Sequence, residues 1–234
     1  MNLHELLDEL FPDGHEVGCD DEVLVGSGRV KGREVAVIGT AGHAAIGIEI
    51  ALNLAAAVLQ VIKSHPGRPI LMLVDTQGQR LSRRDELLGI NGYLAHLAKC
   101  LEMARQRGHP LISLVYAEAV SGGFLSFGMM ADEIHTLQEA QVRVMNLPAM
   151  ARITKIPLER LEELSIDSPA FAPGIDNFFK LGGVESVWST PLSEHLEAAL
   201  TRKAGADTRS RLGLDRKGRV LAYPVARRVC TERV

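Results

Sequence analysis

The sequence predicts an α/β fold in which a largely parallel sheet is covered by helices on both faces. Two short runs, residues 69–75 and 111–117, are almost entirely apolar, which is typical of strands buried on both faces. Segments with helical spacing of apolar residues lie before, between and after them. The order strand, helix, strand, helix, strand, helix, strand therefore favours helices packed on a central sheet.

Composition predicts a soluble globular protein. The 234 residues include 46% hydrophobic and 24% charged residues, and the formal net charge of −3 predicts no nucleic-acid partner. No apolar run is long enough for a membrane span, and the N-terminus lacks the pattern of a signal peptide. Cys19, Cys100 and Cys230 are too far apart to predict a metal site, and we expect a cytoplasmic protein.

The elements follow from local patterns, and glycine or proline stops several of them. Gly32 marks a turn between two strands within residues 22–39, and residues 65–67 end a buried helix that follows GTAGHAAIG. The other expected helices cover residues 3–10, 86–108, 123–131, 156–165 and 192–204, and the other expected strands cover 69–75, 111–117, 133–137 and 141–147.

Charge divides the chain into three expected segments: an acidic helical segment, 1–22, a main domain, 23–202, and a basic tail, 203–234. Residues 1–22 hold eight acidic residues and no Lys or Arg, whereas 202–234 hold ten Lys or Arg and three acidic residues. The ordinary interpretation is two solvated ends. The alternative is that the tail, expected to extend or fray, docks an acidic partner.

Two strand-to-loop junctions, LVDTQGQ and YAEAVSGGF, are the candidate site, because ligands bind at the carboxyl ends of strands in open α/β sheets. We expect the backbone amides of Gly123 and Phe124 on one side, and of Gly78 and Gln79 on the other, to form an oxyanion hole. Gly122 would allow the turn. The alternative is that the glycines only permit tight helix–strand packing.

Two glycine-containing loops resemble the sites of other chemistries. AVSGG resembles a nucleophile elbow in which Ser121 would attack, with Asp132 and His195 completing a serine-hydrolase triad. Ser121 equally suits a helix cap, and His195 lies in a polar helix. GTAGHAAIG lacks the lysine of a P-loop, which disfavours a nucleotide enzyme.

Residues 33–155 resemble the carboxyltransferase branch of the crotonase superfamily. VAVIGTAGHAAIGIEIA is similar to that family's first strand and helix entry, and DTQGQRLSRRDE to its Asp-Thr-Pro-Gly loop. SLVYAEAVSGGFLSFGMMADEIHTL is similar to the strand, double glycine and helix that follow. Within this branch, TAGHAAIGIEIALNLAAAVL and the closing VARRV most resemble gamma subunits of biotin-independent malonate decarboxylase.

The resemblance implies a crotonase/ClpP-like fold of ββα units and a subunit that decarboxylates malonyl-S-acyl carrier protein to the acetyl form and CO₂. The oxyanion holes would stabilise the enolate or the carboxylate. The implied partners are a beta subunit and an acyl carrier protein, whose coenzyme-A-like arm carries the substrate, and no bound cofactor is implied. A noncatalytic scaffold subunit remains the alternative.

Three side chains near the junctions are candidates for substrate binding. Gln77 replaces the family proline and either contacts substrate or faces water, the latter being the ordinary interpretation. Arg80 could meet a carboxylate or carrier phosphates, although a solvated loop arginine is commoner. His43 is either a proton donor or a packed histidine. Asp75 and Glu118 either tune a donor or hydrogen-bond the backbone.

Overall fold

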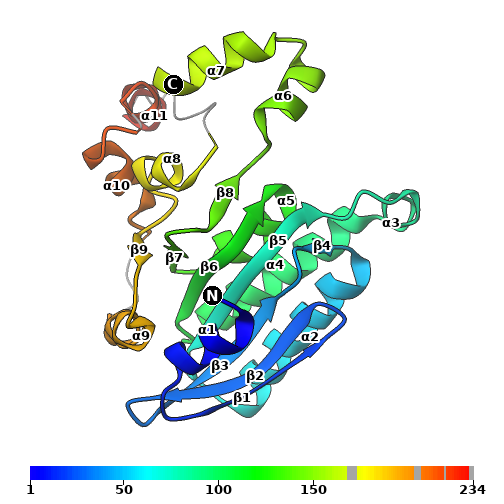
Figure 1. The fold of residues 1–234 in the computed structure, drawn as a ribbon, viewed down its shortest axis with the longest axis vertical. Helices are drawn as coiled ribbons and strands as arrows, with labels where there is room; N and C mark the ends of the chain where they lie inside the picture. The colour runs from blue at the N-terminus through cyan, green and yellow to red at the C-terminus, as the bar shows by residue number, and fades with distance from the viewer. Residues whose placement is uncertain (168–172, 203–206, 219, 232–234) are drawn as a thin grey trace. The chain divides into compact units, whose positions relative to one another are not determined.

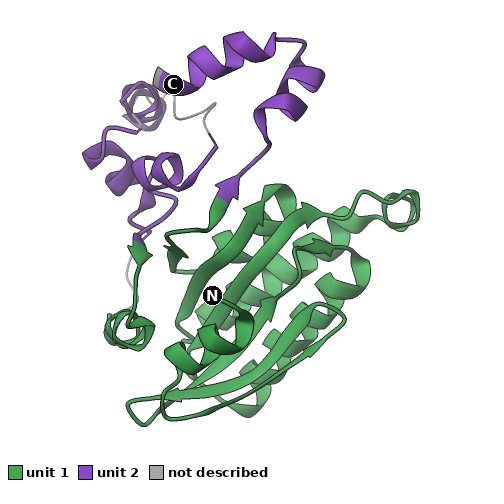
Figure 2. Ribbon diagram, viewed as in Figure 1, with its two compact units in different colours: residues 1–141, 187–204 green, residues 142–186, 205–234 purple. Residues whose placement is uncertain are grey.

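The computed structural model describes residues 1–167, 173–202, 207–218 and 220–231, which form two compact units (Figure 2). The first comprises residues 1–141 and 187–204, and the second 142–186 and 205–234. These bounds differ from the predicted divisions after residues 22 and 202. Within the described ranges, none of the helices is long and apolar enough to cross a membrane.

The first unit holds the sheet and most of the helices (Figure 1). Its strands are β1 (His15–Asp20), β2 (Val23–Val30), β3 (Arg33–Thr40), β4 (Ala44–Ile46), β5 (Ile70–Gln79), β6 (Leu111–Val120) and β7 (Glu133–Leu137). Its helices are α1 (Leu3–Leu10), α2 (Ile48–Ser64), α3 (Arg83–Leu87), α4 (Ile90–Gln106), α5 (Ser121–Ser126), the 3₁₀ turn η1 (Gly128–Met130) and α9 (Leu192–Thr201).

The second unit is helical, with α6 (Leu147–Thr154), α7 (Leu158–Asp167), α8 (Ile175–Lys180), α10 (Arg209–Asp215) and α11 (Ala222–Thr231). Short strands β8 (Gln141–Arg143) and β9 (Ser186–Trp188) lie where the chain passes from one unit to the other. Arg216 donates hydrogen bonds to the carbonyls of Phe179 and Val184, which ties the residue after α10 to the last turn of α8 and to the segment that follows it.

The sheet runs in the order β1-β2-β3-β5-β6-β7-β9, and β4 pairs with β5. β1, β2 and β3 are antiparallel neighbours, whereas the pairs β3–β5, β5–β6 and β6–β7 are parallel. The predicted turn between β2 and β3 is confirmed: Lys31 and Gly32 both have positive φ, as a tight hairpin requires. The parallel strands end at one edge, and the candidate site lies there.

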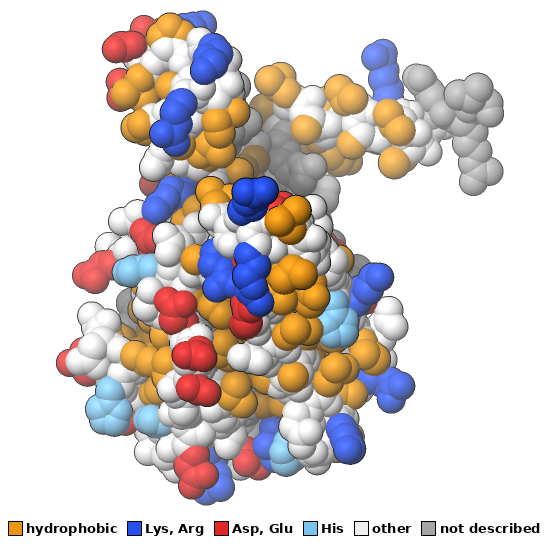
Figure 3. Space-filling view, turned by 90° about the vertical axis from the view of Figure 1, so that its right-hand side faces the viewer, with side chains coloured by type: hydrophobic (Ala, Val, Ile, Leu, Met, Phe, Trp, Pro, Cys, Tyr) orange, Lys and Arg blue, Asp and Glu red, His pale blue; other side chains and the backbone are white. Residues whose placement is uncertain are grey.

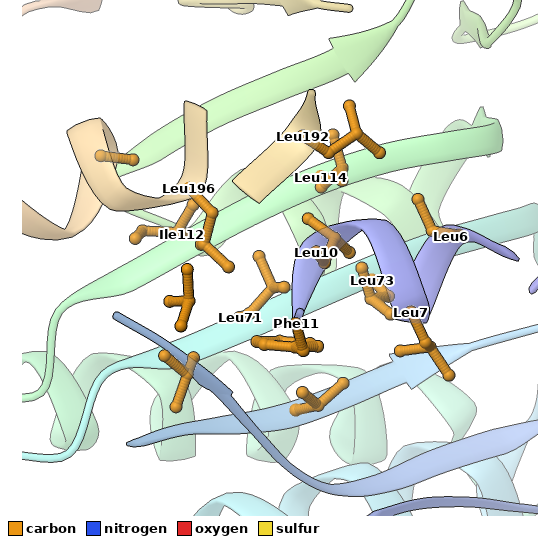
Figure 4. Packing of buried hydrophobic residues seen from close by; sticks show 14 of the residues in the cluster. Leu6, Leu7, Leu10, Phe11, Leu71, Leu73, Ile112, Leu114, Leu192 and Leu196 are labelled. Carbon is orange, nitrogen blue, oxygen red and sulfur yellow. The ribbon is translucent and has the colours of Figure 1, made fainter. Parts of the chain in front are cut away.

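Helices cover both faces of the sheet. α2 and α4 lie side by side on one face, and α1 and α9 lie on the other (Figure 1). Leu6, Leu10 and Phe11 of the α1 segment pack with Leu192 and Leu196 of α9 over the strands (Figure 4). Within the acidic N-terminal segment, α1 is therefore part of the core, because the apolar face of this helix is buried.

Several element boundaries differ from the prediction. The helix expected over 86–108 is two helices, α3 and α4, separated at Gly89, whose φ of 77° suits glycine. The strand predicted over 141–147 ends at Arg143, and Leu147 begins α6. The tail, expected to extend or fray, contains α10 and α11.

Candidate active site

Two loops approach each other closely at the carboxyl ends of β5 and β6. A Cβ atom added to Gly123 would lie 2.7 Å from the carbonyl carbon of Gly78 and 2.9 Å from its oxygen. Both neighbouring groups are backbone, so no side chain can move aside. Gly78 itself has a φ of 108°, a conformation that favours glycine. Close backbone contact between the two junctions therefore requires glycine at Gly78 and Gly123.

Two of the glycine amides already have partners. The N–H of Gly78 donates to Oγ1 of Thr76 at 3.0 Å, and Thr76 donates its own hydroxyl proton to the Ala44 carbonyl at 2.7 Å. The N–H of Gly122 donates to Oε1 of Gln79 at 3.0 Å. The oxyanion role of the Gly78 amide stays a prediction, and in this structure the N–H of Gly78 donates to a buried threonine.

The amides of Gly123 and Gln79 remain the candidate oxyanion donors. Gly123 lies in the first turn of α5, where helix geometry supplies no acceptor within the helix. The N–H of Arg80 donates to the Ile46 carbonyl on the β4 side. Alternation along the strand therefore turns the N–H of Gln79 to the opposite side. The helix turns the N–H of Phe124 towards the carbonyl of Val120.

His43, Asp75 and Glu118 form a second cluster at the same edge of the sheet. Nδ1 of His43 lies 2.8 Å from Oδ1 of Asp75, and the His43 backbone N–H donates to Oδ2 at 2.9 Å. The backbone N–H of Glu118 donates to Oδ1 of Asp75 at 3.3 Å, and a Glu118 carboxylate oxygen lies 3.8 Å from Nδ1 of His43. Asp75 thus positions His43 through both its backbone and its ring.

The geometry of this cluster suits proton transfer. Asp75 is 4% exposed, whereas the His43 side chain is 61% exposed. Because a carboxylate only accepts, Nδ1 of His43 carries the proton that it donates to Asp75, and Nε2 is the nitrogen left to exchange a proton. A buried carboxylate in this position orients an imidazole and stabilises its protonated form.

Thr40 hydrogen-bonds the backbone of Asp75, and Tyr116 hydrogen-bonds Thr40. Neither residue was predicted as part of the site. The Tyr116 hydroxyl donates to the Thr40 carbonyl at 2.9 Å, and Oγ1 of Thr40 accepts from the backbone N–H of Asp75 at 3.2 Å. Burial raises the pKa of Tyr116 well above its ordinary value, and the nearby charge of Asp75 adds to the effect. Tyr116 therefore stays a neutral hydrogen-bond donor.

Arg80 meets carboxylates of this chain. Its Nε donates to Oδ2 of the fully buried Asp85 at 2.6 Å, and Nη2 donates to Glu49 at 2.5 Å. The pKa of Glu49 is lowered to about 2, first by its own backbone N–H and then by Arg84 and Arg80. Contact with Asp85, followed by Glu49, raises the pKa of Arg80. The substrate role of Arg80 remains a prediction, and the structure gives it a positioning role.

The surface around Arg80 is mixed in charge. A cavity of about 570 Å³ beside it is lined by two arginines, Arg80 and Arg84, and by four carboxylates. Leu81 and Leu87 on the adjoining loop are 86% and 77% exposed. Figure 3 shows this side of the molecule, where cationic, acidic and hydrophobic side chains lie next to one another. Gln77 is exposed at the site edge, as its ordinary interpretation predicts.

The predicted serine-hydrolase triad is wrong. Asp132 accepts from the backbone N–H of Leu111 at 2.9 Å and pairs with Arg105. Leu111 is the first residue of β6, and Ser121 follows the last. Because Asp132 binds Leu111, the length of β6, about 30 Å, separates Asp132 from Ser121. His195 stacks on Trp188, with ring centroids 5.7 Å apart. Ser121 has the positive φ, 50°, of an elbow residue without the partners of a nucleophile.

The sequence matches one family model and several known proteins. The family model of the malonate decarboxylase gamma subunit matches residues 41–233. A malonyl-S-ACP:biotin-protein carboxyltransferase of Malonomonas rubra is 37% identical over 74% of this chain and 61% of its own length. An acetyl-coenzyme A carboxylase carboxyl transferase subunit alpha of Saccharophagus degradans is 28% identical over 64% of this chain and 49% of its own. The chain thus spans at most about three fifths of these relatives.

Solved structures match over nearly the whole chain. One chain of a Pseudomonas malonate decarboxylase hetero-tetramer in complex with coenzyme A has a TM-score of 0.79 at 28% identity, covering 97% of both chains. A chain of the Pseudomonas MdcD-MdcE hetero-dimer has a TM-score of 0.76 at 26% identity, covering 92% of both. Transcarboxylase 12S shares the fold, with a TM-score of 0.71 at 19% identity over 88% of this chain and 44% of its own. The predicted crotonase-like carboxyltransferase fold is confirmed.

Proposed function

Because the chain belongs to the malonate decarboxylase gamma subunit family, we propose that it is a catalytic subunit of a malonate decarboxylase. Its substrate is a malonyl thioester carried on the coenzyme-A-like arm of an acyl carrier protein, and its products are the acetyl thioester and CO₂. The match of the family model over residues 41–233 carries the reaction class. The residues at the carboxyl edge of the sheet supply a means of performing it.

The reaction needs a place for negative charge. When the bond between the α-carbon and the carboxyl carbon breaks, CO₂ leaves and its electron pair stays with the thioester as an enolate. Fixed N–H donors lower the barrier by stabilising charge as it develops. We assign this role to the amides of Gly123 and Gln79, which the contact between Gly78 and Gly123 holds together. They stabilise either the enolate oxygen or the departing carboxylate.

The reaction also needs a proton at the α-carbon. We assign its delivery to Nε2 of His43, because Asp75 fixes the opposite side of the ring and the ring is exposed. Ala44, next to His43, pairs with Thr76, and Ala45 pairs with Gly78. His43 is therefore three residues before Ile46, the β4 residue that pairs with the proposed donor Gln79. Asp75 acts through His43 and is a positioning residue.

A partner subunit completes the proposed site. Two structural matches that cover at least 92% of this chain are chains of a malonate decarboxylase hetero-tetramer and of a hetero-dimer. Exposed Leu81 and Leu87 beside the site offer apolar surface for a beta subunit to cover. The acyl carrier protein is the second proposed partner, as it delivers the thioester.

The destination of the carboxyl group is tested by following a radiolabelled carboxyl carbon from malonyl-carrier protein. The complex of this chain with its beta subunit is expected to release the label as CO₂, at a rate unchanged by avidin. The Malonomonas rubra relative is named for transfer to a biotin protein. Label captured on a biotin protein, with release blocked by avidin, would replace biotin-independent decarboxylation by carboxyl transfer.

Ser121→Gly is expected to leave decarboxylation within about twofold of wild type. Glycine removes the hydroxyl and accepts the positive φ of this position. The measurement is the rate of CO₂ release by the purified complex, with thermal unfolding as the control for folding. Loss of activity with an unchanged unfolding midpoint would restore Ser121 as a nucleophile.

Truncation after Gly218 tests the basic tail as a docking segment. It removes α11, whose described side chains are all exposed, and keeps Arg216 with its hydrogen bonds to Phe179 and Val184. We expect weaker binding of the carrier protein or the beta subunit, with unchanged melting of the isolated chain. Normal assembly and turnover of the truncated chain would eliminate the docking role.

A further inference from the structure

A second cluster of potential ligands lies at the junction of α1 and β1, away from the proposed active site. Nε2 of His4 lies 3.5 Å from Oδ2 of Asp8, and Nε2 of His15 lies 3.2 Å from Oδ1 of the same carboxylate. The three ligand atoms all lie within 4.8 Å of one another. We propose that His4, Asp8 and His15 bind a divalent transition-metal ion, with Zn²⁺ as the best-fitting case.

The spacing suits a small tetrahedral ion. With metal–ligand bonds of about 2.0–2.1 Å, neighbouring ligand atoms of a tetrahedral zinc site lie about 3.3 Å apart. Each histidine nitrogen lies at nearly that distance from one of the two Asp8 oxygens, 3.5 Å for His4 and 3.2 Å for His15. One atom from each residue can be chosen so that all three lie within 4.8 Å of one another, so small side-chain rotations would bring them to zinc spacing. Two imidazoles and one carboxylate favour zinc or a similar transition metal, whereas Ca²⁺ and Mg²⁺ prefer oxygen ligands.

The backbone holds the three residues in place. His4 and Asp8 are one helical turn apart on α1, whose first turn is closed by a capping box between Asn2 and Glu5. His15 begins β1 and pairs with Gly28 of β2. These fixed positions reduce the ordering that a metal ion would have to impose.

The contact between Phe11 and Gly28 locks the two elements to each other. A Cβ atom added to Gly28 would lie 2.3 Å from the ring of the fully buried Phe11. The end of α1 therefore lies directly against the strand position that pairs with His15. A metal ion bound here would bridge α1 and β1 and would stabilise the folded state by mass action.

The residues around the proposed metal site affect how tightly it would bind an ion, and the site lies apart from the proposed active site. Nδ1 of His15 is buried and has no hydrogen-bond partner among the residues that the structure describes. Metal-bound histidines usually donate this second N–H, and losing that partner weakens binding by about 10–100-fold. We therefore expect weaker binding than at a zinc site whose histidines keep that hydrogen bond. The proposed metal site lies near the start of β3, because His15 pairs with Gly28 and Gly28 pairs with Val35. Thr40, which contacts Asp75 of the proposed active site, lies at the other end of the same strand.

Calorimetric titration of the chelator-treated full chain with Zn²⁺ tests this site. We expect one site per chain that is lost or weakened at least about tenfold in His4→Ala and in Asp8→Asn, because a lost ligand costs no less than a lost supporting hydrogen bond. His65→Ala, at an exposed histidine after α2, should bind as wild type. Zn²⁺ should raise the unfolding midpoint of wild type and of His65→Ala, but not that of His4→Ala or Asp8→Asn.

The outcomes separate a metal site from a pair of His–Asp contacts. Absence of Zn²⁺ binding to wild type at micromolar concentration would overturn the proposal. Equal binding by wild type, His4→Ala and Asp8→Asn would also overturn it, because other groups would then hold the ion. Ca²⁺ binding as tight as Zn²⁺ binding would show nonspecific attraction to acidic side chains. His4 and Asp8 are exposed helix positions, so these variants are expected to fold.

Discussion

Replacing Gly123 by alanine is expected to lower CO₂ release by the complex about 100-fold or more. The added Cβ would lie 2.7 Å from the carbonyl carbon of Gly78, and backbone on both sides prevents relief by a side-chain movement. The loop and the start of α5 must separate, which moves the proposed donors Gly123 and Gln79 apart. Loss of a single oxyanion donor costs about 10²–10³ in rate in other enzymes.

Gly122, next to Gly123, and Gly92 on α4 provide matched controls. In Gly122→Ala the new Cβ would meet Oε1 of Gln79 at 2.9 Å, which is the end of a movable side chain, so we expect a milder loss. In Gly92→Ala the new Cβ meets nothing within 4 Å, and alanine favours the helix, so activity should be unchanged. Gel filtration of each complex establishes assembly. An assembled Gly123→Ala complex with full activity would contradict the proposed oxyanion role.

Replacing His43 by asparagine is expected to lower the rate by about 10²–10⁴, the usual contribution of a general acid. Asparagine tolerates the φ of 54° at this position, and its amide can still donate to Asp75, so the loop should keep its shape. The measurement is CO₂ release under saturating malonyl-carrier protein. His65→Asn serves as the control at an exposed histidine.

Imidazole rescue separates proton donation from a structural role. Added imidazole should restore part of the rate of the His43→Asn complex and should not affect wild type. Asp75→Asn should lower kcat more than it raises KM, because Asp75 positions His43 and is not expected to touch the substrate. Undiminished activity of an assembled His43→Asn complex would assign proton delivery to another group, such as one from the partner subunit.

Much of the fold was predictable from the sequence because its central strands are buried on both faces. The apolar runs at 69–75 and 111–117 correspond to β5 and β6, and the glycine turn at Lys31–Gly32 joins β2 to β3. β1 was missed because it is largely exposed and lacks a clear alternation of apolar residues. The helices of the tail were missed because a basic, polar segment gives little signal of burial.

The candidate site was only partly predictable. Glycine spacing identified the two junctions, since close backbone contact excludes larger residues. It did not reveal that the N–H of Gly78 donates a hydrogen bond to the Thr76 side chain, or that the N–H of Gly122 donates one to the Gln79 side chain. The pair of His43 and Asp75 joins residues 32 positions apart, which only the pairing of β4 with β5 brings together. Arg80 looked free in sequence, yet the buried Asp85 holds it.

The most direct test of a catalytic role is to titrate a fixed amount of the purified beta subunit with this chain and to measure CO₂ release from malonyl-carrier protein. Neither protein alone is expected to release CO₂. The rate should rise with added chain, reach a plateau when the complex is saturated, and stay near zero when the added chain carries Gly123→Ala. Full release by the beta subunit alone, unchanged by either form of this chain, would reduce it to a scaffold and contradict a shared active site.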